Sequence, residues 1–467
     1  MSQEKVRSFV EEYVPRYMRE GGIPGFSIAV IFHGEPIYLE GFGSRDRERS
    51  LPSDPDTLYG IGSCTKSFVA MAVMQLQEKG LLSVDDPATE YIPLEVGLEG
   101  KPILIRNLLT HSLGLPSVAS STVALHRGVG LDTGIPWGGV DDFYRLVNGA
   151  QQEIVSEPGE RFFYHNAGYR MLGHIIQNVS GVPFHEYITD NIIRQLDMER
   201  TTMVVKEFLE EANRMTPYWR KPSGEIEASR FPYPDVSDIP EFSFISAAGG
   251  VISCVRELLN YLEMNMRKGE WKGRRIVDPE SIEEMQSLQV ERSPGYYGRY
   301  GYGYGWGITP DFNGYKMVSH GGSILVSTAY LAMIPELDMG VAMAANTSGP
   351  PYAAIAEGVL ATLMDMDPLE AVPQLSIKRR MKQLCGTYRN YIDIEEVEVV
   401  NRSGMLYLEQ STPFTETKAP LIPEDPKLEE TDFYIMTEGN KQPVEFDVKE
   451  DGSIDLYLER YVFHKKP

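Results

Sequence analysis

The sequence predicts an α+β fold with an antiparallel sheet flanked by helices, followed by a separate all-β domain. Three observations support this. Strand patterns lie near both ends of the first 365 or so residues, a long region of helices and loops separates them, and short alternating segments fill the C-terminal end. A sheet made from both ends of a domain, with a helical insert between, is typical of α+β rather than alternating α/β folds.

The N-terminal elements are a helix, a hairpin and a buried helix. A charged, helix-like start is followed by two strand-like runs in GFSIAVIFHGEPIYLEGFGSRD, joined by a turn at His33 and Gly34. The run SFVAMAVMQLQEKG (67–80) is apolar nearly all round, which predicts a helix buried on every side, with Gly80 as its C-cap. Residues just before that helix should therefore lie inside the protein.

The middle of the chain, residues 85–290, reads as helices and loops broken by Pro and Gly. Strand signals return only at YKMVSH, LVSTAYLAMI and MGVAMAAN, before a helix near AAIAEGVLATLM. We interpret the Gly- and Tyr-rich segment SPGYYGRYGYGYGWG (293–307) as a structured loop at the rim of a cleft. With Arg299 its only cation, it is not a nucleic-acid platform.

The residue pattern changes at MDPLEAVPQLSIKRR, where two prolines precede a series of short segments in which apolar and polar residues alternate. We expect three parts: a domain over 1–367, a linker over 368–379 and a β domain over 380–467. The simplest structure for the last part is a small closed barrel.

Composition excludes several classes of function. A formal net charge of −23 repels phosphate backbones and anionic lipid surfaces, so we expect neither a nucleic-acid nor a membrane partner. The start lacks a secretory signal and no run is long and apolar enough to span a bilayer, which indicates the cytoplasm. Three scattered cysteines and eight histidines form no disulfide framework or metal-ligand spacing, so we expect reduced thiols, no metal and no cofactor.

The stretch GIGSCTKS (60–67) can be interpreted in two ways. It is one residue short of the phosphate-binding loop G-x-x-x-x-G-K-[ST], with Thr65 in place of the second glycine, and no apolar strand leads into it. It also contains Ser63-x-x-Lys66, a hydroxyl and an amine one helical turn apart. At a helix start directed into the protein, burial can lower the pKa of the lysine until it acts as a base. Ser2 and Lys5 repeat the spacing, but there the amine would stay in water.

Two further motifs fit a serine hydrolase. Tyr164-x-Asn166 supplies a hydroxyl that could pass a proton to a leaving group, although Tyr388 and Asn390 have the same spacing in the β domain. A strand that ends in His320, Gly321 and Gly322 would let a substrate backbone approach closely. The lipase-type G-x-S-x-G elbow is absent.

These three motifs, in this order, resemble those of the penicillin-binding protein and class C β-lactamase superfamily of serine hydrolases. Connecting segments such as EKGLLSVDDPATEYIP and PGERFFYHNAGYRMLG are similar as well, and the resemblance covers roughly residues 5–365. It implies the fold of that family. It makes Ser63 the acylated nucleophile, Lys66 its proton acceptor and Tyr164 the partner that passes the proton on.

The same resemblance assigns the remaining site residues. Asn166 would bind substrate and lysine, and the backbone amides of Ser63 and Ser323, beside Gly322, would form the oxyanion hole. His320, which we count among the catalytic residues, stands where many relatives have lysine. Because histidine is mostly neutral above a pH of about 6.5, we expect a weaker dependence on a free substrate carboxylate than in true β-lactamases.

The C-terminal domain looks similar to the lipocalin-like domain of some microbial members, including an archaeal self-compartmentalising serine protease and D-aminopeptidase-type enzymes. In such relatives it covers the active site or builds the oligomer, which implies a homo-oligomer acting on short peptides. We therefore expect a peptidase on short peptides, with D-residues or small N-terminal residues as candidates. The alternatives are an esterase or β-lactamase-like hydrolase, and a non-enzymatic assembling scaffold.

Overall fold

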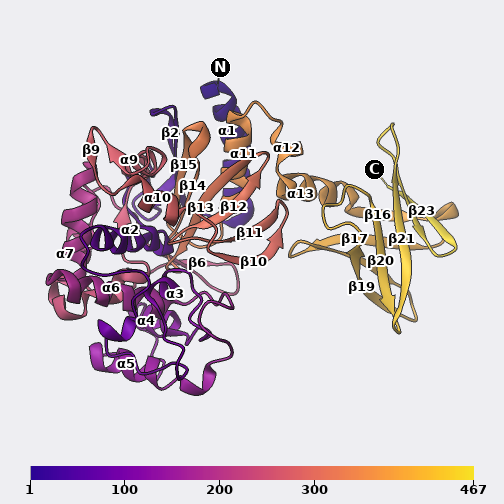
Figure 1. Ribbon diagram of the computed structural model, residues 1–467. Coiled ribbons are helices and arrows are strands. Elements are labelled where there is room, and N and C mark those ends of the chain that lie inside the picture. The colour runs from indigo at the N-terminus through magenta and orange to yellow at the C-terminus, as the bar shows by residue number, and fades with distance from the viewer. Residues whose placement is uncertain (1, 467) are drawn as a thin grey trace. The chain divides into compact units, whose positions relative to one another are not determined.

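The structure is a computed structural model that describes residues 2–466. The chain divides after Asp365 into two compact units, of which the first contains the mixed α and β elements and the second the C-terminal strands (Figure 1). The helices of the first unit are α1 (Ser2–Gly21), α2 (Thr65–Glu78), α3 (Ile105–Leu109), α4 (Ser120–Gly128), α5 (Val140–Asn148), α6 (Asn166–Ser180), α7 (Phe184–Ile188), α8 (Val205–Glu210), α9 (Val255–Met266), α10 (Pro279–Met285) and α11 (Tyr352–Leu363).

The first unit is built on an antiparallel sheet with the strand order β10-β11-β12-β13-β14-β15-β1-β2-β3. Its strands are β1 (Gly25–Phe32), β2 (Glu35–Asp46), β3 (Leu51–Pro52), β10 (Val290–Gly295), β11 (Gly298–Tyr302), β12 (Gly307–Phe312), β13 (Tyr315–Ser323), β14 (Thr328–Ile334) and β15 (Met339–Ala345). Strand β1 pairs with β15, from Phe26 opposite Ala345 to Phe32 opposite Met339. The two ends of the unit thus meet in mid-sheet, which confirms the predicted α+β arrangement.

Short two-stranded ribbons complete the strands of this unit. They pair β4 (Tyr59–Gly60) with β7 (Ile252–Ser253), β5 (Tyr218–Arg220) with β6 (Ile226–Ala228), and β8 (Glu270–Trp271) with β9 (Arg274–Arg275). The β4–β7 ribbon lies directly before the Ser63 segment, so it ties the start of α2 to the chain that precedes α9.

The predicted N-terminal hairpin and buried helix are both confirmed. His33 and Gly34 join β1 to β2 with positive φ angles of 53° and 76°, as a two-residue hairpin turn requires. In α2 every side chain from Thr65 to Leu76 is buried. Gly80 follows the helix with φ 66°, and its amide donates to the carbonyl of Gln77.

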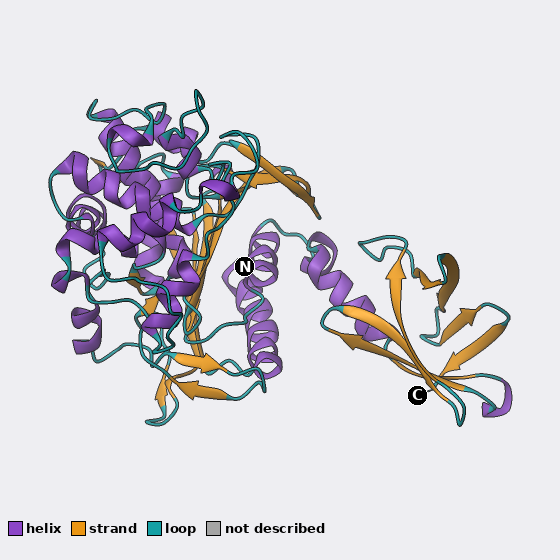
Figure 2. Ribbon diagram, turned by 90° about the horizontal axis from the view of Figure 1, so that it is seen from below, coloured by secondary structure: helices purple, strands orange, loops and turns teal. Residues whose placement is uncertain are grey.

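Two helical layers cover the sheet. Helices α1 and α11 pack together on one face, where a Cβ added to Gly358 would lie 2.1 Å from the ring of Phe9. Helix α9 packs against β1, β14 and β15, and Tyr261 of α9 stacks on Phe68 of α2 with the ring centres 3.8 Å apart. Figure 2 shows the larger group of helices on the side of the sheet away from the N-terminal helix. The start of α2 is thereby held between the sheet and the helical region.

One sequence interpretation is wrong. Strand signals do not return only at residue 315, because β10, β11 and β12 occupy residues 290–312, including most of the segment interpreted as a loop. Glycine and tyrosine alternate in that segment instead of apolar and polar residues, so the period-two pattern of a half-buried strand is hidden. Tyrosine side chains nevertheless suit a pleated surface.

The second unit is a closed antiparallel barrel, as predicted. Its strands are β16 (Gly386–Arg389), β17 (Glu396–Arg402), β18 (Met405–Ser411), β19 (Glu416–Pro423), β20 (Asp432–Thr437), β21 (Asn440–Val448), β22 (Ile454–Leu458) and β23 (Tyr461–Lys465). Alternate apolar side chains, such as Leu406 and Leu408 of β18 and Val444 and Phe446 of β21, fill its core.

The segment predicted as a linker is largely helical. Residues 368–379 lie in α12 (Pro368–Ala371) and α13 (Pro373–Leu384), and Ile377 and Leu384 of α13 belong to the barrel core. Both prolines stand at the first position of a helix, where proline's missing N–H costs nothing. These two prolines therefore mark the starts of α12 and α13.

Within residues 2–466, no helix is both long enough and apolar enough to cross a bilayer.

Candidate active site

Ser63 lies in a 3-10 turn, η1 (Gly62–Cys64), that runs directly into α2. The turn begins at Gly62 with φ 54°, a conformation that glycine adopts without strain. The Ser63 side chain is half-buried and opens into a cavity of about 540 Å³, together with Tyr164, Asn166, Gly322 and Ser323. The structure therefore brings these five predicted site residues to one cavity.

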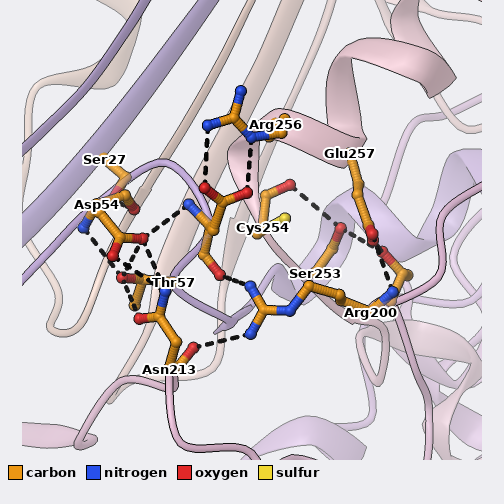
Figure 3. Close-up of polar contacts among 11 residues, drawn as sticks. Ser27, Asp54, Thr57, Arg200, Asn213, Ser253, Cys254, Arg256 and Glu257 are labelled. Carbon is orange, nitrogen blue, oxygen red and sulfur yellow. Dashed lines mark hydrogen bonds and ion pairs between the residues drawn. The ribbon is translucent and has the colours of Figure 1, made fainter.

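A polar network holds the chain segment that leads to Ser63 (Figure 3). Both carboxylate oxygens of Asp54 accept from Asn213, at 2.9 and 3.0 Å, and the Asp54 carbonyl accepts from Ser27 of β1 at 2.8 Å. Asp56 forms a two-point ion pair with Arg256 of α9, at 2.6 and 2.9 Å. These contacts tie the segment before Ser63 to the sheet and to α9.

Lys66 lies one helical turn after Ser63, and its side chain is fully buried. Its Nζ is 3.0 Å from Ser63 Oγ, and it donates to Asn166 Oδ1 and to the carbonyl of Ala248, both at 2.8 Å. Burial lowers the pKa of Lys66 well below its ordinary value, and the positive charge of Arg170 lowers it further. Lys66 therefore loses its proton at a lower pH than an exposed lysine does.

The geometry around Nζ assigns a direction to its lone pair. A neutral amine has two N–H groups and one lone pair. Asn166 Oδ1 and the Ala248 carbonyl can only accept, so they take the two N–H groups. The remaining position, which carries the lone pair, faces Ser63 Oγ and can take its proton.

Tyr164 and Asn166 flank the start of α6. His165 caps that helix by accepting from the amide of Gly168 at 3.0 Å, which directs Asn166 towards Lys66. Tyr164 lines the same cavity as Ser63, and Lys66 Nζ lies 4.9 Å from the centre of the Tyr164 ring. Burial raises the pKa of Tyr164, so its phenol stays protonated at neutral pH.

His320 lies on β13 with both ring nitrogens engaged. Its Nδ1 is 2.7 Å from the carbonyl of Gly321, which can only accept, so Nδ1 carries the proton. Its Nε2 then accepts from the hydroxyl of Tyr302 at 2.8 Å. Burial and the Lys66 charge lower the pKa of His320 to about 3. This imidazole is neutral and does not face a substrate with a free nitrogen.

Gly322 and Ser323 bring the end of β13 against the Ser63 segment. A Cβ added to Gly322 would lie 1.9 Å from the carbonyl of Ile61 and 2.9 Å from the amide of Ser63. A Cβ added to Gly62 would lie 2.4 Å from the amide of Ser323. Only glycines permit this approach, which places the Ser63 and Ser323 amides side by side beside Ser63 Oγ.

Sequence reasoning did not identify three contributors to this site. The Ala248 carbonyl lies at the end of a 3-10 helix, η7 (Pro240–Ala248), and binds Lys66, but a backbone group leaves no side-chain signal. Tyr302 binds His320 from within the segment interpreted as a loop. His111 is fully buried with φ 60°, and its ring lies 4.2 Å from that of Tyr164 and 4.9 Å from that of Tyr302.

The competing copies of the motifs lie elsewhere. Lys5 is half-exposed and forms an ion pair with Asp365 at 2.7 Å. Tyr388 is buried in the barrel core, where its hydroxyl donates to the carbonyl of Leu384 at 2.7 Å. Neither Lys5 nor Tyr388 is among the described residues that line the cavity, so Ser63 and Lys66 are the copy with the geometry for nucleophilic catalysis.

The described part of the chain offers no metal site. Within residues 2–466, no group of three or more His, Cys, Asp or Glu side chains could hold a metal ion, and all three cysteines are free thiols. None of the described side chains that line the cavity is Asp, Glu, Lys or Arg. The arrangement supports transfer of an acyl group to Ser63 with an amine as base.

Residues 10–363 match the family model described as Beta-lactamase, so the chain belongs to the β-lactamase family of serine hydrolases. Residues 368–464 match a second model, described as the Pab87 octamerisation domain. The resemblance stated from the motifs is confirmed.

Among curated relatives, the chain is 26% identical over 353 residues to Protein flp of Staphylococcus aureus (strain MW2), which covers 74% of this chain and 63% of that protein. The chain thus spans less than two thirds of this relative's length. It is 25% identical over 334 residues to the putative penicillin-binding protein PbpX of Bacillus subtilis (strain 168), covering 70% of this chain and 75% of that one.

Among solved structures, the octameric penicillin-binding protein homologue from Pyrococcus abyssi matches with a TM-score of 0.88 and 36% identity, over 98% of this chain and 99% of that chain. EstCE1, a hydrolase with promiscuous acyltransferase activity, matches with a TM-score of 0.61 and 22% identity, over 78% of this chain and 98% of that chain. The second likeness shows the fold alone.

Proposed function

We propose that this protein is a peptidase that cleaves short peptides through an acyl-enzyme on Ser63. The observation that carries the proposal is the buried Lys66 amine, 3.0 Å from Ser63 Oγ with its two N–H groups already bound. A neutral amine in that position can activate the hydroxyl at neutral pH without a histidine.

The proposed reaction has two halves, acylation of Ser63 and hydrolysis of the acyl-enzyme, and the same groups act in both. Ser63 Oγ attacks the scissile carbonyl carbon and gives its proton to Lys66 Nζ. The oxyanion accepts from the amides of Ser63 and Ser323. When the C–N bond breaks, the leaving amine takes a proton from Lys66 through the Tyr164 hydroxyl. Water then attacks the acyl carbon and loses its proton by the same route, which releases the acid and restores Ser63.

The neutral state of His320 affects which substrates the site can bind. With both nitrogens bound to Gly321 and Tyr302, it supplies no cation for a substrate carboxylate. The cavity surface is uncharged, so binding at this wall relies on shape and neutral hydrogen bonds. Peptides without a free carboxylate at this wall are therefore suitable substrates.

The test is a covalent label followed by a substrate panel. Incubation with a fluorophosphonate should add one phosphonyl group, and peptide mass spectrometry should find it on Ser63. The protein should then release p-nitroaniline from short aminoacyl p-nitroanilides. If the protein hydrolysed only p-nitrophenyl esters, it would be an esterase and not a peptidase. If it took no label and hydrolysed no substrate, the assembling scaffold would be favoured.

We also propose that the protein forms homo-oligomers through its barrel. The barrel matches the octamerisation model, and the Pyrococcus relative is described as octameric. The loop at Tyr391, Ile392 and Ile394 exposes three large apolar side chains, at 77, 75 and 69%. Ile392 also has φ 48°, an unfavourable conformation for a β-branched residue. A second copy of the chain would cover this apolar loop.

Replacing Ile392 with aspartate should shift the protein to smaller species in size-exclusion chromatography with light scattering. A carboxylate in an apolar interface loses hydration without gaining a partner. Ile135→Asp makes the same substitution at a site in the first unit that is 39% exposed, and should leave the mass unchanged. Oligomers that survive both Ile392→Asp and Tyr391→Asp would contradict this interface.

A further inference from the structure

Arg170 of α6 carries a positive charge one helical turn beyond Asn166, and its side chain is fully buried. Its Nε donates to the carbonyl of Ile245 at 3.1 Å and its Nη1 to Ser120 Oγ at 2.9 Å. The ring of Trp137 lies 5.4 Å from the guanidinium carbon. All of these neighbours are neutral, although the group that they surround is a cation.

The charge of Arg170 is not neutralised inside the described chain. Within residues 2–466, no carboxylate forms an ion pair with Arg170, and its Nη2 has no partner in hydrogen-bond geometry. Buried guanidinium groups are normally paired, because desolvation of an unpaired charge is costly. Arg170 therefore creates a positive potential that favours an electron-rich group nearby.

Tyr233 links Arg170 to the cavity that contains Ser63. It is only 9% exposed and lines that cavity. Its hydroxyl lies close to Gly249, since a Cβ added to that glycine would be 2.8 Å from it, and the same Cβ would be 3.3 Å from the carbonyl carbon of Gly62. Burial raises the pKa of Tyr233 and the Arg170 guanidinium opposes that shift, so the phenol is protonated at neutral pH.

The donor properties of the two groups give the Tyr233 proton a direction. Arg170 lies close enough to Tyr233 for its charge to act on the phenol. A guanidinium has only donors, so Arg170 cannot take the phenolic proton. That proton remains available to an acceptor on the cavity side. The nearby positive charge polarises the O–H bond and strengthens its donation.

We propose that Tyr233, backed by Arg170, donates a hydrogen bond to a substrate oxygen that flanks the scissile carbonyl. The enzyme then prefers substrates with an amide or carboxylate oxygen at that position, and the carboxylate most of all, because it also compensates the Arg170 charge. Tyr233 is the group that contacts substrate, and Arg170 is a positioning residue that acts through it. This inference rests on the proposed acyl transfer at Ser63.

Two series of amides test the proposal, with the added group on the acyl side in one and on the leaving-group side in the other. Each series has three members of equal length that end in a carboxylate, a carboxamide or a methyl group, and chromatography follows the released amine. In one series the wild-type kcat/KM for both oxygen-bearing members should exceed that for the methyl member about tenfold or more. Tyr233→Phe should bring these ratios close to one, mainly through KM.

Arg170 variants separate charge from shape. Arg170→Met should lower the ratio of carboxylate to carboxamide, and Arg170→Lys should retain part of it. Tyr144→Phe is the matched control. Tyr144 is a buried tyrosine that does not line the cavity, and its hydroxyl oxygen is 2.7 Å from His174 Nδ1. Its ratios should equal those of the wild type.

The outcomes distinguish this inference from the proposed function. Equal cleavage of all three members in both series by the wild type, or unchanged ratios in Tyr233→Phe, would overturn the role of Tyr233 and leave acyl transfer intact. A wild type that cleaves none of the amides and takes no fluorophosphonate label would overturn both.

Discussion

Replacing Ser63 with alanine should lower kcat/KM by about 10³-fold or more and abolish labelling by a fluorophosphonate. In the described site, the Ser63 hydroxyl combines three properties: it opens to the cavity, its oxygen lies 3.0 Å from Lys66 Nζ, and its chain segment packs closely against the amide of Ser323. Without it the acyl group has no acceptor. The half-buried position accommodates alanine, so the fold should remain.

Ser67→Ala provides the matched control. Ser67 is buried on the same helix, one turn further on, and its hydroxyl donates to the carbonyl of Cys64 at 2.9 Å. The same chemical change there should leave labelling complete and kcat/KM within a few-fold of the wild type. If Ser63→Ala turned over substrate as fast as Ser67→Ala, Ser63 would not be the nucleophile.

Local sequence spacing was sufficient to predict the centre of the site. Ser63 and Lys66 are three residues apart at the start of a helix, and such residues necessarily lie on one face. The apolar run after them indicated that this helix is buried, which in turn indicated a lysine with a lowered pKa. These steps depend on helix geometry and burial, and both can be predicted from a dozen consecutive residues.

Contacts between distant segments could not be predicted in the same way. Lys66 binds the carbonyl of Ala248, 182 residues away in the chain, and a backbone carbonyl carries no mark of its role in the sequence. His111 reaches the site with a positive φ that few non-glycine residues adopt, so neither pattern nor propensity indicates it. Tyr302 was hidden by the same glycine-tyrosine alternation that concealed β11.

His320 shows that the type of a residue and its place in the sequence do not establish why its side chain is neutral. The sequence indicated a group that is neutral at ordinary pH, and the structure agrees. The reason differs, because burial and the contacts with Gly321 and Tyr302 hold His320 in one neutral tautomer, whereas the sequence argument used only the ordinary pKa of histidine. A residue expected to face substrate instead supports the wall behind it.

Replacing Lys66 with methionine should lower kcat/KM by about 10³-fold or more. It should also remove the pH dependence of kcat/KM that the Lys66 amine causes. In the wild type, kcat/KM should rise with pH as Lys66 loses its proton and reach a plateau well below the ordinary lysine pKa, because burial lowers that pKa. A wild-type rate that is constant from pH 5 to 9 would argue against a lysine base.

The same substitution should change how stability depends on pH. Between its lowered pKa in the folded protein and its ordinary pKa, Lys66 is neutral in the folded protein and protonated in the unfolded chain, so the unfolded state binds one more proton in that window. Stability of the wild type therefore rises with pH across that window, by up to about 1.4 kcal/mol per pH unit, and is lost as pH falls. Lys66→Met lacks this contribution.

Denaturant unfolding at several pH values between 6 and 10 measures the effect. As pH rises, the free energy of unfolding of the wild type should increase relative to that of Lys66→Met. The slope is the readout, because methionine also removes the hydrogen bonds to Asn166 and Ala248 at every pH. Lys5→Met is the control, since the Lys5 side chain is 49% exposed in the other Ser-x-x-Lys pair and should give a curve parallel to the wild type. Parallel curves for Lys66→Met would mean that the amine is charged in the folded protein, and a charged amine has no lone pair with which to activate Ser63.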